Sequence, residues 1–298
     1  MGNDLREKLK QNKFVVTVEI DPPKGANPWG AYNSMWPLAR MVDAVNIADS
    51  PMARMRMSPI ALAHLVQEKL ELEAIFHLTC RDRNLMGLQS ELLGAFALGV
   101  KNILTLTGDK PQSGDHPGAT GVFDVDSIGL AEIAARLNRG YDIMDNPLDS
   151  KTDFFVGAVA NPGAEDLGEE IERIIRKKDA GVKFFQTQPV FDITNLERFL
   201  KALPESSVPV IYGLLPLKSV KLALYLNKNV PGVHVPERLI DRLRKGGRDA
   251  GVEIARELLY QMRSMVPGVH IFPMGDVPLV EEILKEEGSS YGECSHCI

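Results

Sequence analysis

The chain has 298 residues and a formal net charge of −6, and its acidic and basic side chains are interspersed along the sequence. This length suits one large domain or two small ones, and the charge gives no basic surface of the kind that binds nucleic acid. No apolar run is long enough to span a membrane, and the polar residues 1–8 lack the apolar core of a signal peptide. The three cysteines, Cys80, Cys294 and Cys297, are too few for a disulfide framework, so we expect a cytoplasmic protein.

The sequence alternates apolar segments with amphipathic ones from end to end. Short runs rich in apolar and β-branched residues predict strands at 14–20, 44–48, 74–79, 103–106, 154–160, 182–187, 208–214 and 269–272. Helical patterns are predicted at 4–12, 31–41, 58–70, 85–98, 125–138, 164–178, 194–202, 218–227, 236–245, 249–265 and 276–287. Residues 110–123 are rich in glycine and proline and predict a long loop that is functional or mobile.

Strands that alternate with helices, without hairpin signals between them, are typical of parallel βαβ units. Eight such units in a chain of this length favour a single α/β domain, a (β/α)8 TIM barrel over residues 1–288 with extra helices before the eighth strand. A doubly wound open sheet is the alternative, but no Gly-x-Gly-x-x-Gly motif follows the first strand. Residues 289–298 are set apart as a tail that contains Cys294 and Cys297.

In barrels of this kind the active site is built at the C-terminal ends of the strands. The polar residues at or near these ends are Glu19, Asp49, His77, Thr79, Asp109, Asn161 and Gln188. The three carboxylates would repel one another and raise the pKa of at least one, which suits a general acid. Glu19, in an otherwise apolar strand that ends before two prolines, is the best candidate. The alternatives are a solvated strand-end carboxylate for Glu19 and a simple turn residue for Asp109.

Other features leave more than one interpretation open. His77 lies among apolar neighbours, where a histidine is more often a core residue than a catalyst. Gln188 can offer a donor and an acceptor together to the edge of a heterocyclic ring. Lys177 either stabilises the C-terminus of its helix or contacts a phosphate. Cys294 and Cys297 could bind a metal only if a partner contributed further ligands, and the sequence predicts no other metal site.

Five short motifs, in this order and spacing, resemble the methylenetetrahydrofolate reductase family. The stretches that match are Val18–Pro23, His77–Arg81, Leu106–Asp109, Asp179–Gly181 with Thr187–Gln188, and Gly213–Pro216. Each motif is short, but together they extend over nearly the whole chain. The segment 120–128 is most similar to the reductases of bacteria and to those fused to homocysteine methyltransferases.

The resemblance implies a flavin-carrying (β/α)8 barrel that reduces 5,10-methylenetetrahydrofolate to 5-methyltetrahydrofolate. By position, Glu19 would be the acid that protonates the folate, and Asp109 would lie beside both the flavin and the pterin. Gln188 would bind the pterin. The residues implied to contact the flavin are Asp49, His77, Thr79, Asn161 and Lys177, the last of them near its phosphate.

Several positions depart from the pattern of the family, namely Ala48, Thr107, Asn161, Glu165 and Val220. In relatives most of these positions serve the flavin tail or the nicotinamide donor, whereas the pterin positions match. We therefore expect FAD, with FMN as the alternative, and NADH, NADPH or a partner iron–sulfur protein as the electron donor. The family also implies a homo-oligomer or a subunit of a redox complex. The alternative function is that of a folate-binding subunit in a larger methyl-transfer or electron-transfer complex.

Overall fold

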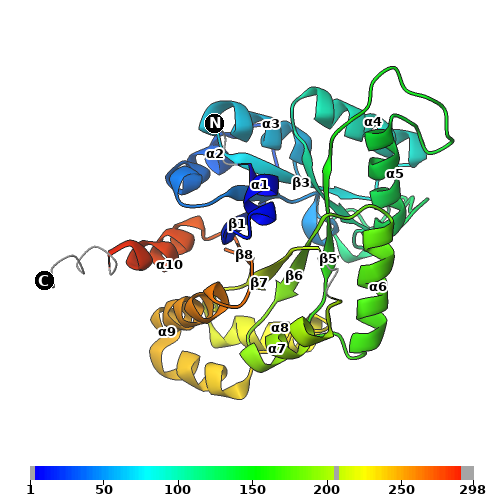
Figure 1. Cartoon of the computed structure of the whole chain (residues 1–298). Helices are drawn as coiled ribbons and strands as arrows, with labels where there is room; N and C mark the ends of the chain where they lie inside the picture. Colours follow the sequence, from blue (N-terminus) through cyan, green and yellow to red (C-terminus); the bar gives the residue numbers. More distant parts are fainter. Residues whose placement is uncertain (1–3, 205–207, 290–298) are drawn as a thin grey trace, which may run out of the picture.

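The computed structural model describes residues 4–204 and 208–289, and within these residues eight parallel strands close into a barrel in sequential order (Figure 1). The strands are β1 (Val15–Ile20), β2 (Ala44–Ile47), β3 (Glu73–Thr79), β4 (Asn102–Leu106), β5 (Phe155–Ala160), β6 (Phe184–Pro189), β7 (Val210–Leu214) and β8 (Gly268–Ile271). The barrel closes where β1 pairs with β8, with Thr17 opposite His270. The predicted TIM barrel is confirmed, and the open sheet is excluded.

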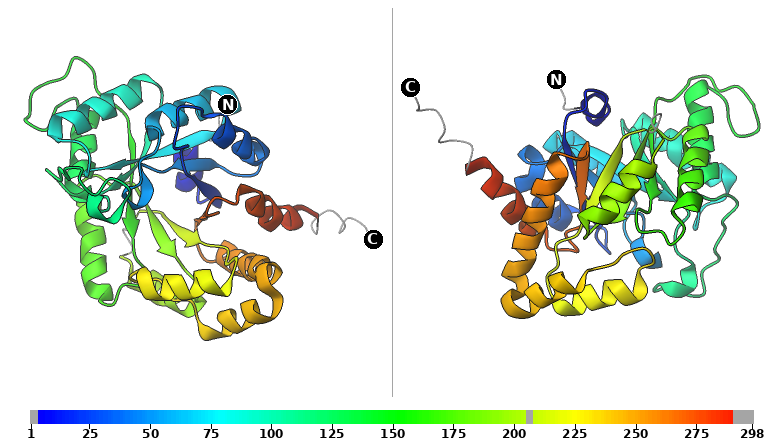
Figure 2. Two further views of the ribbon diagram at one scale, coloured as in Figure 1. Left: turned by 180° about the vertical axis from the view of Figure 1, so that it is seen from behind. Right: turned by 60° about the horizontal axis from the view of Figure 1, so that its bottom comes forward.

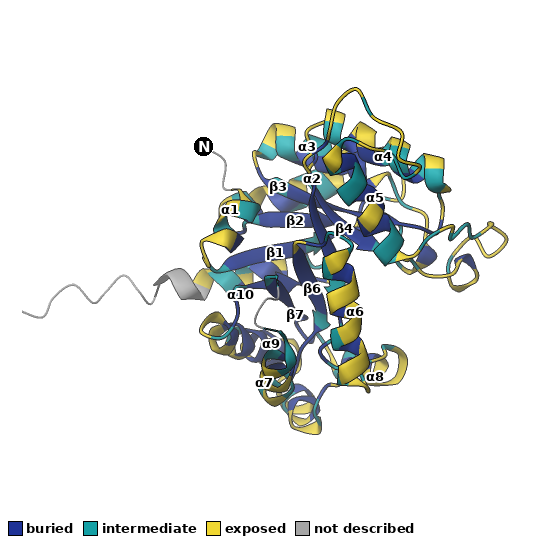
Figure 3. Ribbon diagram, turned by 45° about the vertical axis from the view of Figure 1, so that its right-hand side comes forward, coloured by how far each residue is buried: buried dark blue, intermediate teal, exposed yellow. Residues whose placement is uncertain are grey.

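Helices surround the barrel, and their exposed faces point outward while the strands are buried (Figures 2 and 3). The helices are α1 (Leu5–Lys10), α2 (Trp29–Met35), α3 (Pro59–Leu70), α4 (Leu85–Ala97), α5 (Ser127–Arg139), α6 (Leu167–Asp179), α7 (Ile193–Ala202), α8 (Val220–Asn229), α9 (Glu237–Arg263) and α10 (Val277–Ser289). None of those in the described part of the chain combines the length and the apolar character that a membrane span requires.

Two predicted helices differ from the structure in an informative way. The helix expected at 31–41 is α2 followed by a short 3₁₀ helix, Trp36–Arg40, in which Pro37 cannot donate the hydrogen bond that a continuous α-helix needs. The two helices expected at 236–245 and 249–265 are one element, α9, with a kink at Gly247. Gly247 has φ 55° and ψ −135°, a conformation that residues with a side chain rarely adopt. The extra helical segment before β8 is therefore confirmed.

Apolar side chains fill the half of the barrel that faces the N-terminal ends of the strands. Leu5 and Leu9 of α1 pack there against Val15 and other inward-facing strand residues. Phe155 and Phe184 stack across the interior with their ring centroids 4.8 Å apart. Helix α1 thus closes this end of the barrel, and the open space inside lies toward the C-terminal ends of the strands.

The predicted loop 110–123 lies against the exit of β3 rather than extending away from the barrel. The backbone N–H groups of Val122 and Phe123 donate to the carbonyls of Arg81 and Cys80, at 2.8 and 3.1 Å. The carboxylate of Asp115 accepts the N–H of Met55 at 2.9 Å. The loop therefore belongs to the rim where the site was predicted. The tail 290–298, with Cys294 and Cys297, lies outside the described residues.

Candidate functional site

A cavity of about 280 Å³ lies at the C-terminal end of the barrel. It gathers six of the residues predicted from the sequence, namely Glu19, Asp49, His77, Thr79, Asp109 and Gln188. These residues come from strands far apart in the chain and meet because parallel strands all end at one rim. Its apolar walls are formed by Leu104, Leu106, Val159 and Phe272.

Asn161 and Lys177 lie in a second cavity of about 300 Å³, which shares Leu106, Val159 and Gln188 with the first. The Lys177 ammonium donates to the Val159 carbonyl at 2.6 Å. Burial lowers the pKa of Lys177, and the nearby Glu170 carboxylate only partly offsets this. The structure thus places these two predicted residues beside the first cavity rather than in it.

The Glu19 side chain lies next to His270, which comes from the last strand. The His270 Nε2 atom is 3.9 Å from Glu19 Oε2, and its Nδ1 is 2.8 Å from the Thr17 hydroxyl. Burial acts to raise the pKa of Glu19, but the neighbouring imidazoles of His270 and, to a smaller extent, His77 outweigh it, so the pKa lies below its ordinary value. The expectation that repulsion among rim carboxylates raises the pKa of Glu19 is therefore wrong.

Two amide side chains face each other across the interior. Asn46 on β2 donates to the Gln186 oxygen at 2.6 Å, and Gln186 on β6 donates to the Asn46 oxygen at 3.1 Å. The Asn46 nitrogen is also 3.0 Å from His77 Nε2. Because an amide nitrogen only donates, Nε2 accepts, and a neutral His77 carries its proton on Nδ1. Burial lowers the pKa of His77 to about 4, which keeps the ring neutral at the wall of the cavity.

The buried neutral ring of His77 should make the protein sensitive to acid. Its pKa falls from 6.5 in the unfolded chain to about 4 in the folded one, so between these values only the unfolded state binds the proton. Stability is therefore highest above pH 6.5 and decreases as the pH falls toward 4, by about 3 kcal/mol from this group. We expect urea unfolding at pH 7 and pH 4 to show a smaller pH-dependent loss for His77→Gln than for the wild type. Replacing the more exposed His64 by Gln is the control, and equal losses in all three proteins would contradict the prediction.

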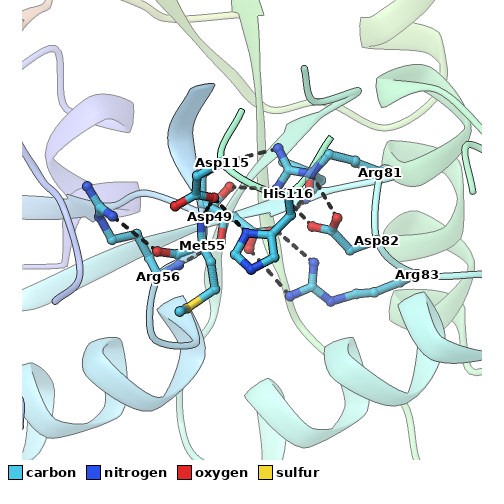
Figure 4. A network of polar contacts seen from close by, with 10 residues as sticks. Asp49, Met55, Arg56, Arg81, Asp82, Arg83, Asp115 and His116 are labelled. Carbon is cyan, nitrogen blue, oxygen red and sulfur yellow. Dashed lines mark hydrogen bonds and ion pairs between the residues drawn. The ribbon is translucent and has the colours of Figure 1, made fainter. Parts of the chain in front are cut away.

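The Asp49 carboxylate holds the rim between β2 and β3 together. It accepts the backbone N–H of Thr79 at 2.9 Å and the Thr79 hydroxyl at 3.0 Å. The Arg83 guanidinium donates to the same carboxylate at 2.8 Å, and Arg81 donates at 2.8 Å to Asp82 (Figure 4). The Asp49 carboxylate is thus already hydrogen-bonded to groups of the protein. Its structural role is evident, and its role in binding a cofactor stays a prediction.

Asp109 reaches the cavity because the residue before it is a glycine. Gly108 has φ +91°, and a Cβ there would lie 2.9 Å from the Cβ of Thr79. Only a residue without a side chain fits this turn, and the turn places the exposed Asp109 at the mouth of the cavity. Gln188, near the end of β6, lines both cavities and so lies where a ligand could extend from one to the other.

The sequence analysis missed the polar residues inside the strands. These are Thr17, Asn46, Gln186 and His270, all buried and linked by hydrogen bonds within the barrel. The sequence did indicate Thr17, because it precedes Glu19 by two positions and side chains at this spacing point to the same face of a strand. In a closed barrel, a polar residue within an apolar strand is as good a candidate for the site as a polar residue at the end of the strand. Arg81, which also lines the cavity, was noted only as part of a motif.

Fold and site together define a (β/α)8-barrel protein whose carboxyl-end cavity combines an acid, an imidazole and amides beside apolar walls. The profile of the family described as methylenetetrahydrofolate reductase matches residues 4–288, and the chain belongs to this family.

Relatives and solved structures agree with this assignment. The chain is 23% identical over 240 residues to methylenetetrahydrofolate reductase 1 of Schizosaccharomyces pombe, covering 76% of this chain and 38% of that protein. It is 24% identical over 235 residues to the 5,10-methylenetetrahydrofolate reductase of Pectobacterium carotovorum, covering 74% and 72% of the two chains. The chain thus spans well under half of the yeast relative.

A solved structure from Clostridium thermocellum has a similar fold, with a TM-score of 0.65 and 17% identity over 94% of this chain and 96% of that one. That structure is of an uncharacterized protein that binds two copies of 5-methyl-5,6,7,8-tetrahydrofolic acid.

Proposed function

We propose that the protein exchanges a hydride between a tetrahydrofolate and a bound flavin, as a 5,10-methylenetetrahydrofolate reductase. The observation that carries this proposal is that Glu19, Asp109 and Gln188 line one cavity at the rim of a barrel of this family. A carboxylate, a second carboxylate and an amide can together bind the polar edge of a pterin and move a proton.

The residues around the two cavities fit a flavin. The apolar side chains Leu104, Leu106 and Val159 offer a wall for a flat ring, and neutral His77 offers a hydrogen-bond donor on that wall. Lys177 in the adjoining cavity would hold an anionic tail. When bound, the flavin supplies the hydride acceptor or donor. We propose FAD on the basis of the family. FMN is the alternative, and the two adjoining cavities of about 280 and 300 Å³ favour it, because FMN carries only the ring and one phosphate.

The lowered pKa of Glu19 suits this residue to accept a proton rather than to donate one. Because its pKa is lowered, the carboxylate is ionised near neutral pH and ready to accept a proton. When 5-methyltetrahydrofolate is oxidised, a hydride leaves the methyl carbon and a folate N–H loses its proton as the methylene bridge closes. Glu19 would take that proton. In the reductive direction Glu19 must first be protonated, which bound folate would favour by excluding water from the carboxyl.

The test is anaerobic and uses the purified protein loaded with oxidised flavin. Addition of 5-methyltetrahydrofolate should bleach the visible flavin band, because the hydride passes from the methyl group to the flavin. This readout needs neither NADH, NADPH nor a partner iron–sulfur protein, so it isolates the folate half-reaction from electron input. Bound flavin that stays oxidised would contradict the proposal.

The second candidate is a folate-binding subunit without its own redox step. The lowered pKa of Glu19 favours it, because an ionised carboxylate is a poor acid for reducing the methylene compound. A likeness in fold to a protein that binds 5-methyl-5,6,7,8-tetrahydrofolic acid is compatible with both candidates. Binding of 5-methyltetrahydrofolate without bleaching of bound flavin would select this second function.

A further inference from the structure

A cavity of about 980 Å³ lies at the opposite end of the barrel from the candidate active site. Its lining includes residues that precede or begin strands, such as Phe155, Lys183, Val210 and Pro267, so it faces the N-terminal ends of β5 to β8. Helix α1 contributes Leu9 to the same wall. The proposed reaction uses none of these residues.

The lining combines an apolar wall with an excess of positive charge. Four cationic side chains and a single carboxylate line the cavity, in a chain whose net charge is −6. Arg6 binds Asp153 through two bonds of 3.0 Å, and Lys10 pairs with Glu7 at 2.6 Å, so two of the four cations are neutralised. Lys183 is exposed, and no ion pair to its ammonium occurs among the described residues. Arg263 lies over the Phe14 ring at 5.0 Å, on the same side of the barrel.

A buried hydroxyl in the same lining has no hydrogen-bond partner. Tyr212 is fully buried, and its ring packs edge-on against Phe199 with centroids 6.2 Å apart. Its hydroxyl forms no hydrogen bond with any residue that the structure describes. A buried polar group without a partner is costly, so such groups are rare and call for an explanation. A ligand that supplies the missing partner is one explanation, because Tyr212 lines the cavity.

We propose that this cavity binds an amphipathic organic anion, with its apolar body against the apolar wall and its anionic group at Lys183. Tyr212 would donate to a polar atom at the other end of the ligand. The volume lies within the range of small-molecule sites, and an apolar lining with a few placed polar groups is their usual chemistry. Because Leu9 and Phe155 belong both to this wall and to the cluster that fills the barrel, occupancy would also stiffen that end of the barrel.

The probe for this site is 8-anilinonaphthalene-1-sulfonate, which has an aromatic body and one sulfonate. We expect saturable binding, with fluorescence that rises as the probe leaves water. Lys183→Met should weaken binding about tenfold, as expected when one charge-assisted contact is lost. Lys221→Met, which removes an exposed lysine on α8, is the matched control and should bind as the wild type does.

Tyr212→Phe gives an independent readout, because it removes the hydroxyl but keeps the ring. Without probe, this variant should melt at the same temperature as the wild type or higher, since no bond is lost. With probe, its gain in melting temperature should be smaller. Tyr260→Phe, at a tyrosine that is 70% exposed, is the control and should change neither value.

Four results would overturn the proposal. Both Lys183→Met and Tyr212→Phe could bind the probe as tightly as the wild type, or Tyr212→Phe could lower the melting temperature without probe. Saturating 5-methyltetrahydrofolate could displace the probe, which would place it at the other end of the barrel. Probe binding could also decrease as protein concentration rises, which would assign the cavity to contact with a second copy. None of these results depends on flavin chemistry, so the proposed function stands or falls separately.

Discussion

Replacing Glu19 by Gln should slow flavin bleaching by 5-methyltetrahydrofolate by about 10²- to 10⁴-fold, the usual contribution of one general acid or base. Gln has nearly the same size but cannot accept the proton that the folate releases. We expect the effect to be specific to this position, because Glu19 lies beside His270 in the cavity and not on the open surface. Anaerobic stopped-flow absorbance of the flavin band measures the effect.

The control for this experiment is Glu172→Gln, which makes the same chemical change at an exposed position on α6. It should bleach at the wild-type rate. Flavin content and binding of 5-methyltetrahydrofolate should be measured for each variant, so that a slow rate is assigned to proton transfer and not to an empty site. An unchanged rate in Glu19→Gln would leave that residue only a binding role.

Replacing Asp49 by Ala should lower the free energy of unfolding by about 3–5 kcal/mol, the range for breaking a buried ion pair. The Asp49 side chain is only 4% exposed and that of its partner Arg83 19%. Without the carboxylate, the N–H of Thr79 also loses its acceptor. Urea unfolding followed by circular dichroism measures the loss.

The surface control is Asp145→Asn, which breaks an ion pair to Arg136 and suits the left-handed backbone at this position, where φ is 63°. The Asp145 side chain is 76% exposed, so solvent and salt already screen the pair and its loss should change stability little. If Asp49→Ala were as stable as Asp145→Asn, the described bonds would not hold the rim. A stable Asp49→Ala protein that no longer bound flavin would instead assign Asp49 to the cofactor.

The fold followed from the sequence because each strand of a closed parallel barrel is buried on both faces. Such strands appear as continuous apolar runs, for example Phe155–Ala160 and Val210–Leu214, and the helices between them show the longer period of a half-buried surface. The observed helix boundaries differ from the predicted ones by a few residues where the local backbone determines them. An example is Pro37, at which the helix predicted after β1 changes to a 3₁₀ helix. Gly247 changed the geometry of α9 without changing its place in the chain.

The site followed from the sequence only in part, for a physical reason. That Glu19 and Asp109 face one cavity is a matter of topology, which the order of the strands determines. The lowered pKa of Glu19 depends on its neighbours His270 and His77, and nothing in the sequence around Glu19 indicates them. The hydrogen bonds between Asn46 and Gln186 likewise join residues 140 positions apart. Sequence patterns locate single side chains, whereas the pKa of a side chain depends on the groups next to it in space.

The bond between Thr17 and His270 joins residues 253 positions apart, on the first and the last strand. A nascent chain on the ribosome that has completed seven strands already carries Glu19, Asp109 and Gln188, yet it lacks His270, a neighbour that lowers the pKa of Glu19. Truncated or interrupted products of synthesis would therefore bury much of their apolar surface without forming the contact between the first and the last strand. The polar network that includes Thr17 and His270 is in this way complete only in chains synthesised through β8.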